Sequence, residues 1–213
     1  MSEMNRREAL KALGAAMSVP MVGAFGFGEE QMERARELAH SARGTEIESG
    51  VAYAPKFFTA LEWAALRVLV DDIIPRDERS GSATDAAVPE YIDFLMADQT
   101  PAPREQGPSS TQVAVRGGLA WLDGECARRF GGKRYAACSR AERTKVLDDI
   151  AWPAKAKPEL SHGAAFFTRM RDMTASGFFS SKIGVQDLKY MGNIPIAKGD
   201  GCPKEAVGRL GVG

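Results

Sequence analysis

The sequence predicts an all-α protein: a single irregular helical bundle with an N-terminal export signal and a glycine-rich, extended C-terminal tail. Apolar residues recur at helical spacing in several segments, and no segment shows the sustained alternation that is typical of a half-buried strand. A chain of 213 residues is long enough to bury one core but hardly two. We therefore expect a signal over residues 1–28, a spacer over 29–55, a helical domain over 56–181 and a tail over 182–213.

The first 28 residues have the pattern of a bacterial export signal. A positively charged start is followed by residues 12–28, which contain no ionisable side chain. The adjacent arginines indicate the twin-arginine route, although Ala9 stands where the usual motif has Phe. The residues that match the motif are Arg6, Arg7, Leu10 and Lys11. A membrane-anchoring or amphipathic helix is the alternative, but Pro20 and four glycines interrupt a stretch shorter than the ~20 residues of a membrane span.

This signal predicts a periplasmic protein. Small residues near Gly23 and Ala24 do not form a clear cleavage site, so an uncleaved form tethered to the inner membrane stays open. Residues 29–55 are charged or rich in turn formers and show no clear period, so we expect a spacer and a folded domain that begins near Lys56. Residues 182–213 are dense in Gly and Pro, which favours an extended tail with at most one short helical turn.

Local signals place the helices. Thr59 and Ser139 are each followed three residues later by Glu, which is the capping-box pattern of a helix start. The first of these helices ends before Pro75. Further helices are expected at residues 89–96, 111–130 and 161–177 because apolar residues recur there at helical spacing between turn signals. Cys126 lies on the apolar face of the 111–130 helix, so we expect it in the core.

Composition excludes several function classes. Lys plus Arg and Asp plus Glu both number 28, so there is no positive excess to neutralise nucleic acid. The three cysteines include no Cys-x-x-Cys pair, which excludes a zinc ribbon or a disulfide framework. His40 and His162 are the only histidines, so a histidine-based triad or two-histidine metal helix is not expected, and both are predicted at the surface.

Paired carboxylates are the remaining catalytic candidates. Asp71–Asp72 and Asp148–Asp149 are adjacent pairs, but neighbouring residues on a helix point about 100° apart and cannot converge on one substrate atom. Solvated helix faces are the simpler interpretation. A free-standing periplasmic enzyme that uses Asp72 or Asp123 is kept as an alternative. We assign no catalytic, cofactor-binding or metal-binding residue in this chain.

Partner-binding candidates cluster near the C-terminus. Phe178 and Phe179 follow Gly177 at the junction with the tail, where burial by this chain alone is not assured. Tyr190 adds a third aromatic side chain to this predicted interface. Cys202 lies in a Gly-rich loop context, and an odd cysteine in an exported protein fits either a disulfide to a partner subunit or a free thiol.

Several sequence blocks resemble the gluconate 2-dehydrogenase subunit 3 family. The resemblance covers about residues 56–203. Its two most specific blocks are residues 57–75, ending in Asp-Asp-Ile-Ile-Pro, and residues 88–95, Val-Pro-Glu-Tyr-Ile-Asp-Phe-Leu. It continues through residues 118–123, 166–167, 174–181 and the closing Gly-Cys-Pro of residues 201–203.

This resemblance implies a non-catalytic small subunit of a periplasmic sugar, glycoside or sugar-acid dehydrogenase. Members of the family pair with a large FAD-containing subunit of the glucose-methanol-choline type, often with a cytochrome c haem subunit as well. The small subunit commonly presents the signal of the whole complex to the twin-arginine translocon, so that the flavoprotein is exported bound to it. The alternatives are the free-standing enzyme and a transient, membrane-tethered assembly factor.

Overall fold

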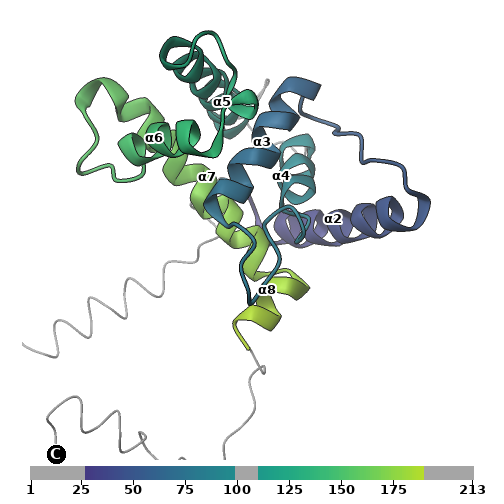
Figure 1. Cartoon of the computed structure of the whole chain (residues 1–213). Coiled ribbons are helices and arrows are strands. Elements are labelled where there is room, and N and C mark those ends of the chain that lie inside the picture. The colour runs from purple at the N-terminus through teal and green to yellow at the C-terminus, as the bar shows by residue number, and fades with distance from the viewer. Residues whose placement is uncertain (1–26, 99–109, 190–213) are drawn as a thin grey trace, which may run out of the picture.

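The computed structural model describes residues 27–98 and 110–189, and within these ranges all the regular secondary structure is helical (Figure 1). This confirms the predicted all-α class. None of the helices in the described ranges is both long and apolar enough to cross a membrane. The elements in chain order are α2 (Glu29–Ser49), α3 (Ala60–Ile73), α4 (Val88–Ala97), α5 (Ser110–Arg129), the 3-10 helix η2 (Tyr135–Ala137), α6 (Arg140–Ile150), the 3-10 helix η3 (Pro158–Leu160), α7 (Ser161–Phe179) and α8 (Lys182–Asp187).

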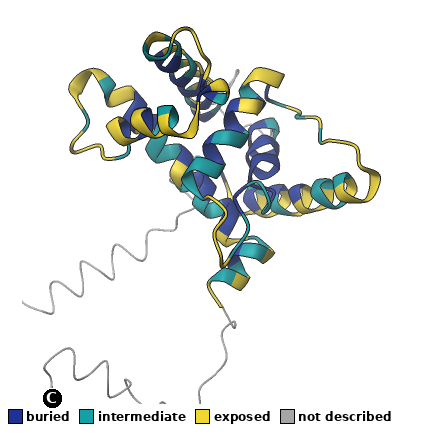
Figure 2. Ribbon diagram, viewed as in Figure 1, coloured by how far each residue is buried: buried dark blue, intermediate teal, exposed yellow. Residues whose placement is uncertain are grey.

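Helix α4 lies at the centre of the molecule. Every residue from Val88 to Met96 is buried, because α2, α3 and α7 all pack against this helix (Figure 2). The buried set includes two carboxylates, Glu90 and Asp93. A helix that is buried on all sides is usually apolar all round, so these two carboxylates require an account of their own.

Both predicted capping boxes are confirmed. At the start of α3, the Glu62 backbone N–H donates to the Thr59 hydroxyl at 3.4 Å, and the Thr59 N–H donates to the Glu62 carboxylate at 2.8 Å. Ser139 and Glu142 repeat the arrangement at the start of α6, with distances of 3.3 and 2.7 Å. Each box satisfies amide groups that a helix start otherwise leaves without partners.

Helices α5 and α7 approach closely because each has a glycine at the contact. A Cβ atom built on Gly118 of α5 would overlap the ring of Phe166 from α7. In the reverse direction, a Cβ on Gly163 of α7 would overlap the indole of Trp121 from α5. Each helix thus receives an aromatic ring from the other in the space above a glycine.

The prediction of a spacer over residues 29–55 is wrong. Residues 29–49 form the 21-residue helix α2, which packs mainly on α4. Its buried residues are Met32, Ala35 and Ala39, and Phe27 just before it is also part of the core. Two of the three buried positions are alanines, so the apolar stripe was too weak to show against the charged residues around it. The folded region therefore already includes Phe27 and α2, and does not begin near Lys56.

A buried carboxylate joins the end of this N-terminal region to the core. Asp93 of α4 accepts a hydrogen bond from the Tyr53 hydroxyl at 2.8 Å. It also accepts from the backbone N–H groups of Lys56, Phe57 and Phe58, at 2.7, 3.0 and 3.2 Å. The segment that leads into α3 is thereby tied to the central helix.

The start of the predicted tail is helical. Residues 182–187 form α8, whose first turn is capped by the Ser181 hydroxyl, which accepts from the Gly184 N–H at 3.1 Å. An ion pair of 2.7 Å between Arg79 and Asp187 joins α8 to the loop after α3. Helix α8 is the one short helical element that the sequence analysis allowed in this tail.

Candidate functional site

Most of the predicted functional residues lie outside the described ranges. They are the export-signal residues Arg6, Arg7, Leu10 and Lys11 and the tail residues Tyr190 and Cys202. Their roles stay predictions. The structure does place the two phenylalanines of the predicted interface, and it separates them.

Phe178 is not available as an interface residue in this structure. Helix α7 continues through Gly177 as far as Phe179, and Phe178 continues its buried face, four residues after Thr174 and eight after Met170. Only 1% of Phe178 is exposed. The prediction that Phe178 faces a partner is therefore wrong, because the helix does not end at Gly177.

Phe179 is exposed, as an interface residue must be. Its exposed fraction is 42%, and its ring meets the Phe178 ring edge-on, with 5.2 Å between centroids. Leu188 follows α8 directly and is 56% exposed. Because α7 and α8 contact each other, these two apolar side chains lie at the same end of the molecule. We call Phe179 and Leu188 the C-terminal apolar pair.

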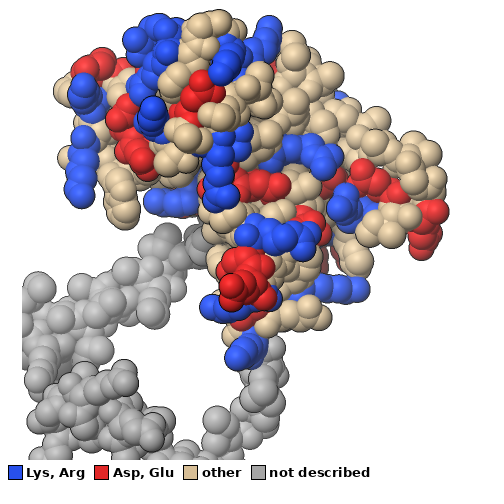
Figure 3. All heavy atoms as spheres, viewed as in Figure 1, with Lys and Arg blue, Asp and Glu red and all other residues tan. Residues whose placement is uncertain are grey.

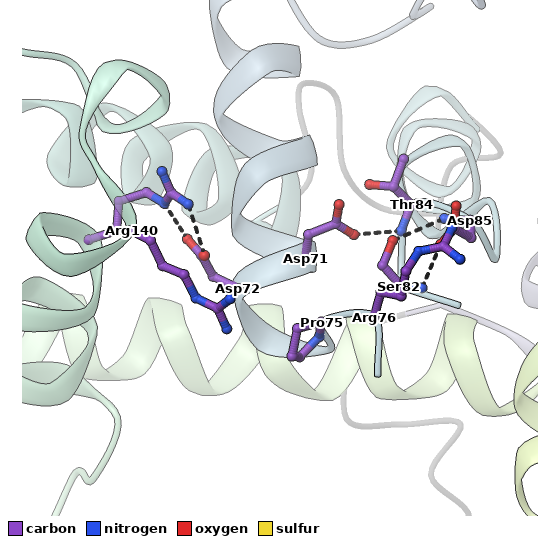
Figure 4. A pocket seen from close by; sticks show the side chains of 9 residues that line it. Asp71, Asp72, Pro75, Arg76, Ser82, Thr84, Asp85 and Arg140 are labelled. Atoms are coloured by element: carbon purple, nitrogen blue, oxygen red, sulfur yellow. Dashed lines mark hydrogen bonds and ion pairs between the residues drawn. The ribbon is translucent and has the colours of Figure 1, made fainter. Parts of the chain in front are cut away.

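The adjacent aspartates of α3 point to opposite sides of the helix (Figure 4). Asp72 accepts from Arg143 at 2.6 and 3.2 Å and from the Tyr135 hydroxyl at 2.7 Å. Asp71 accepts from the Thr84 backbone N–H at 2.7 Å. The prediction that these two carboxylates do not converge is confirmed, but the prediction of a solvated helix face is wrong here, because both side chains are partly buried and bound to other parts of the chain.

A polar pocket of about 390 Å³ surrounds these aspartates. Its lining residues are Asp71, Asp72, Pro75, Arg76, Ser82, Thr84, Asp85, Arg140 and Arg143. The carboxylates in it are already engaged: besides the bonds of Asp71 and Asp72, Asp85 pairs with Arg76 at 2.6 Å. Burial, followed by the charge of Asp72, raises the pKa of the Tyr135 phenol, so that group stays protonated and donates to Asp72 well above neutral pH. These groups hold α3, η2, α6 and the loop after α3 together.

Asp123, the other carboxylate of the enzyme alternative, also has a structural role. It accepts from the Tyr135 backbone N–H at 2.9 Å and lies 3.4 Å from a guanidinium nitrogen of Arg134, which fixes η2 on α5. His40 and His162 are both exposed, as predicted. Among residues 27–98 and 110–189, no group of three or more His, Cys, Asp or Glu side chains is placed to hold a metal ion.

The surface itself carries charges of both signs. On the face shown in Figure 3, Lys and Arg side chains gather over the upper part of the molecule with Asp and Glu side chains between them, and the lower part carries both signs. The large apolar side chains exposed in the described ranges are Leu38, Ile47, Val51, Leu61, Val113, Trp152, Phe179 and Leu188.

The geometry thus defines a small helical protein whose carboxylates mostly serve its own fold and which exposes apolar side chains at several points. Residues 60–201 match the family of gluconate 2-dehydrogenase subunit 3. Because this match covers well over half of the chain, the protein belongs to that family, whose name denotes a subunit of a dehydrogenase complex. No curated protein and no solved structure matches the chain.

Proposed function

We propose that this chain is the non-catalytic small subunit of a periplasmic, FAD-dependent sugar, glycoside or sugar-acid dehydrogenase. It supplies the twin-arginine signal for the complex and stabilises a large flavoprotein subunit of the glucose-methanol-choline type. The family match over residues 60–201 supports this proposal most directly. The FAD belongs to the large subunit in this proposal, and a cytochrome c subunit is a candidate further member of the complex.

The engaged carboxylates support the non-catalytic part of the proposal. A general acid or base needs a side chain that is free to reach a proton of the substrate. Asp72 and Asp123 instead hold Tyr135, Arg143 and Arg134 within the fold. The proposal therefore places substrate oxidation wholly in the partner.

The C-terminal apolar pair is our proposed contact with the flavoprotein. Exposed aromatic side chains are enriched among the residues that contribute most to protein interfaces. Phe179 and Leu188 lie at the end of the described chain, so the tail with Tyr190 and Cys202 begins beside them. A contact there is continuous with a tail that wraps around the partner or bridges to it through Cys202.

The test is a pull-down of the tagged full chain from its native host in non-reducing buffer. We expect a flavoprotein in one-to-one amount, with a flavin absorbance spectrum and activity on a panel of sugars. The exposed Trp152, in the loop before η3, offers a matched control. Phe179→Ser should reduce recovery of the flavoprotein about tenfold, as for a central interface residue, whereas Trp152→Ser should not change it.

Each alternative gives a different result. A chain that oxidises sugars alone with an artificial acceptor would be the free-standing enzyme. A chain that binds the flavoprotein only before export, and is absent from the mature complex, would be an assembly factor. Replacing Arg6 and Arg7 by Lys tests export separately: both subunits should then remain in the cytoplasm.

A further inference from the structure

The two described parts of the chain carry opposite net charges, which the balanced composition of the whole chain conceals. Residues 27–98 contain 7 Lys and Arg against 15 Asp and Glu, a formal net charge of −8. Residues 110–189 contain 14 Lys and Arg against 8 Asp and Glu, a formal net charge of +6. Helices α5 and α6 of the positive part form the upper part of the molecule, where Lys and Arg side chains gather (Figure 1 and Figure 3).

An exposed tryptophan lies in the loop that follows α6 in this positive part. Trp152 is 66% exposed, whereas Trp63 is buried and Trp121 is partly buried against the core. A large aromatic ring stabilises a fold mainly through the surface that it buries. The Trp152 indole leaves most of its surface in water, so that surface stays available to a partner.

The loop holds this indole at the surface with an ammonium group beside it. The Trp152 carbonyl oxygen accepts hydrogen bonds from the backbone N–H groups of Lys155 and Ala156, at 2.8 and 2.9 Å. This turn brings the Lys155 ammonium nitrogen to 5.7 Å from the centre of an indole ring. Ala156 and Leu160 pack against the core and anchor the loop from below. The fold therefore presents an indole and a cation together.

Three exposed lysines flank the tryptophan in the sequence, and none of them is paired with a carboxylate of the described residues. They are Lys145, Lys155 and Lys157. Among the acids nearby, Asp149 is paired with Arg129 at 2.6 Å. The exposed acids that remain beside the loop are Asp148 and Glu159. The unpaired cations therefore outnumber the unpaired acids around the indole.

We propose that this loop and the positive surface of α5 and α6 form a membrane-docking face that binds an anionic phospholipid bilayer. Tryptophan favours the boundary between water and lipid, and a lysine beside it can bury its stem while its ammonium group stays at the lipid phosphates. An acidic protein would match the positive charge, but the indole next to the lysines favours a bilayer, which has an apolar layer directly beneath its anionic groups.

This face is separate from the proposed contact with the flavoprotein. The C-terminal apolar pair lies at the end of α7 and just after α8, and α8 and α5 lie at opposite ends of the molecule in Figure 1. A chain that docks through the loop after α6 therefore leaves that pair accessible. In the cell the docking rests on the proposed export, which brings the chain to the periplasmic side of the inner membrane.

The test uses the isolated full chain with vesicles of phosphatidylglycerol and phosphatidylcholine, and with vesicles of phosphatidylcholine alone. Residues 1–28 have the composition of a membrane-binding segment, but they contain no Trp. Tryptophan fluorescence, with brominated lipids as quenchers, therefore reports contact by the helical region and not by this segment. Trp152→Ser gives the background signal of the other two tryptophans.

We expect the anionic vesicles to quench the emission and shift it to shorter wavelength, and Trp152→Ser to lose both changes. Lys155→Glu combined with Lys157→Glu should lower the vesicle partition constant at least about tenfold, since each lysine near an anionic surface contributes about fivefold. Lys182→Glu combined with Lys189→Glu makes the same change of charge at α8 and is the matched control. It should lower the constant less than about threefold, because charges beyond a Debye length are screened.

Equal losses for the two lysine pairs would overturn the proposal, because the vesicles would then respond to net charge alone. Binding without quenching of Trp152 would also overturn it, and so would an absence of binding to the anionic vesicles. If the Lys155→Glu and Lys157→Glu chain instead lost an acidic protein from the pull-down while no vesicles were bound, the loop would be a protein-binding site. The vesicle measurement needs neither flavoprotein nor export, so its failure leaves the pull-down result standing, and a failed pull-down does not affect it.

Discussion

Helix α4 carries two buried carboxylates, three residues apart, with opposite environments. Asp93 accepts four hydrogen bonds from the segment that leads into α3. Glu90 has no exposed surface, and neither of its carboxylate oxygens accepts a hydrogen bond from another residue of the described chain. Within the described residues, other parts of the chain thus supply hydrogen-bond donors to Asp93 but none to Glu90.

The difference reflects which element covers each carboxylate. The Asp93 side is covered by a segment whose backbone N–H groups point at the carboxylate. The charges that influence Glu90 are Arg67 of α3 and Arg43 and Glu46 of α2, none of which donates to it. A buried carboxylate without donors opposes ionisation. The cover over Glu90 therefore lacks the hydrogen bonds that hold the segment over Asp93.

The largest expected effect comes from removing the satisfied carboxylate. Asp93→Ala leaves three backbone N–H groups and the Tyr53 hydroxyl without their acceptor, so the free energy of unfolding should fall by about 3 kcal/mol or more. Asp93→Asn keeps one acceptor oxygen, so its free energy of unfolding should lie between those of the wild type and Asp93→Ala. Urea denaturation followed by circular dichroism measures both.

Asp148→Ala is the matched control, because this α6 carboxylate is exposed. Its effect should stay within about 0.5 kcal/mol. If Asp93→Ala were no more harmful than Asp148→Ala, the four hydrogen bonds would not hold the segment, and the contrast with Glu90 would disappear.

A second change tests the packing on the far side of the core, where α5 meets α7. Gly118→Ala places a methyl group where the Phe166 ring lies, so the ring or helix must shift at a cost of about 1–3 kcal/mol. At the neighbouring Gly117, a Cβ would have no atom within 4 Å beyond its chain neighbours and the adjacent backbone of its own helix. Gly117→Ala should therefore raise stability by up to about 1 kcal/mol through helix propensity. If thermal unfolding showed that both variants change the stability in the same direction, the close contact between Gly118 and Phe166 would be absent.

The sequence predicts correctly those features whose signal lies within a few neighbouring residues. The capping boxes at Thr59 and Ser139 act within four residues, so the sequence predicted both helix starts. The spacing of Met32, Ala35 and Ala39, with Gly50 as a stop, was present in the spacer that we predicted. Alanine is small and occurs on exposed and buried helix faces alike, so Ala35 and Ala39 do not indicate a buried face unless the helix that packs on them is known.

Other features depend on contacts between distant segments. The sequence predicts Phe178 in an interface because it follows Gly177, whereas that glycine lies within α7 and packs against Tyr91 of α4.

A third change tests Glu90 directly, with a smaller effect and the opposite sign. Burial raises the pKa of Glu90 above its ordinary value of 4.5. Between the unfolded and folded pKa values, Glu90 keeps its proton in the folded chain but has lost it in the unfolded chain. The contribution of Glu90 to the free energy of unfolding is therefore full below about pH 4.5 and falls as the pH rises through that window. Glu90→Gln removes the ionisation, and should stabilise the chain at neutral pH by about 1 kcal/mol.

The measurement is urea unfolding across that window. The wild-type chain should lose stability with rising pH more steeply than Glu90→Gln. Glu48→Gln, at an exposed position near the end of α2, should follow the wild-type slope. Parallel slopes for wild type and Glu90→Gln would mean that water or another group already satisfies the buried carboxylate.

The smallest effect is a difference in local opening between α2 and α7 within the unmodified chain. Helix α2 packs mainly on α4 and buries only Met32, Ala35 and Ala39, whereas α7 contacts five other helices. Elements with few buried apolar contacts open at lower free energy than the core. Native-state hydrogen exchange should therefore show α2 amides exchanging at least about tenfold faster than those of α7, and Glu90→Gln should narrow the gap by slowing α2 alone. If α2 and α7 exchanged together, the chain would unfold as one unit, and the unsatisfied side of α4 would be as firmly closed as the satisfied one.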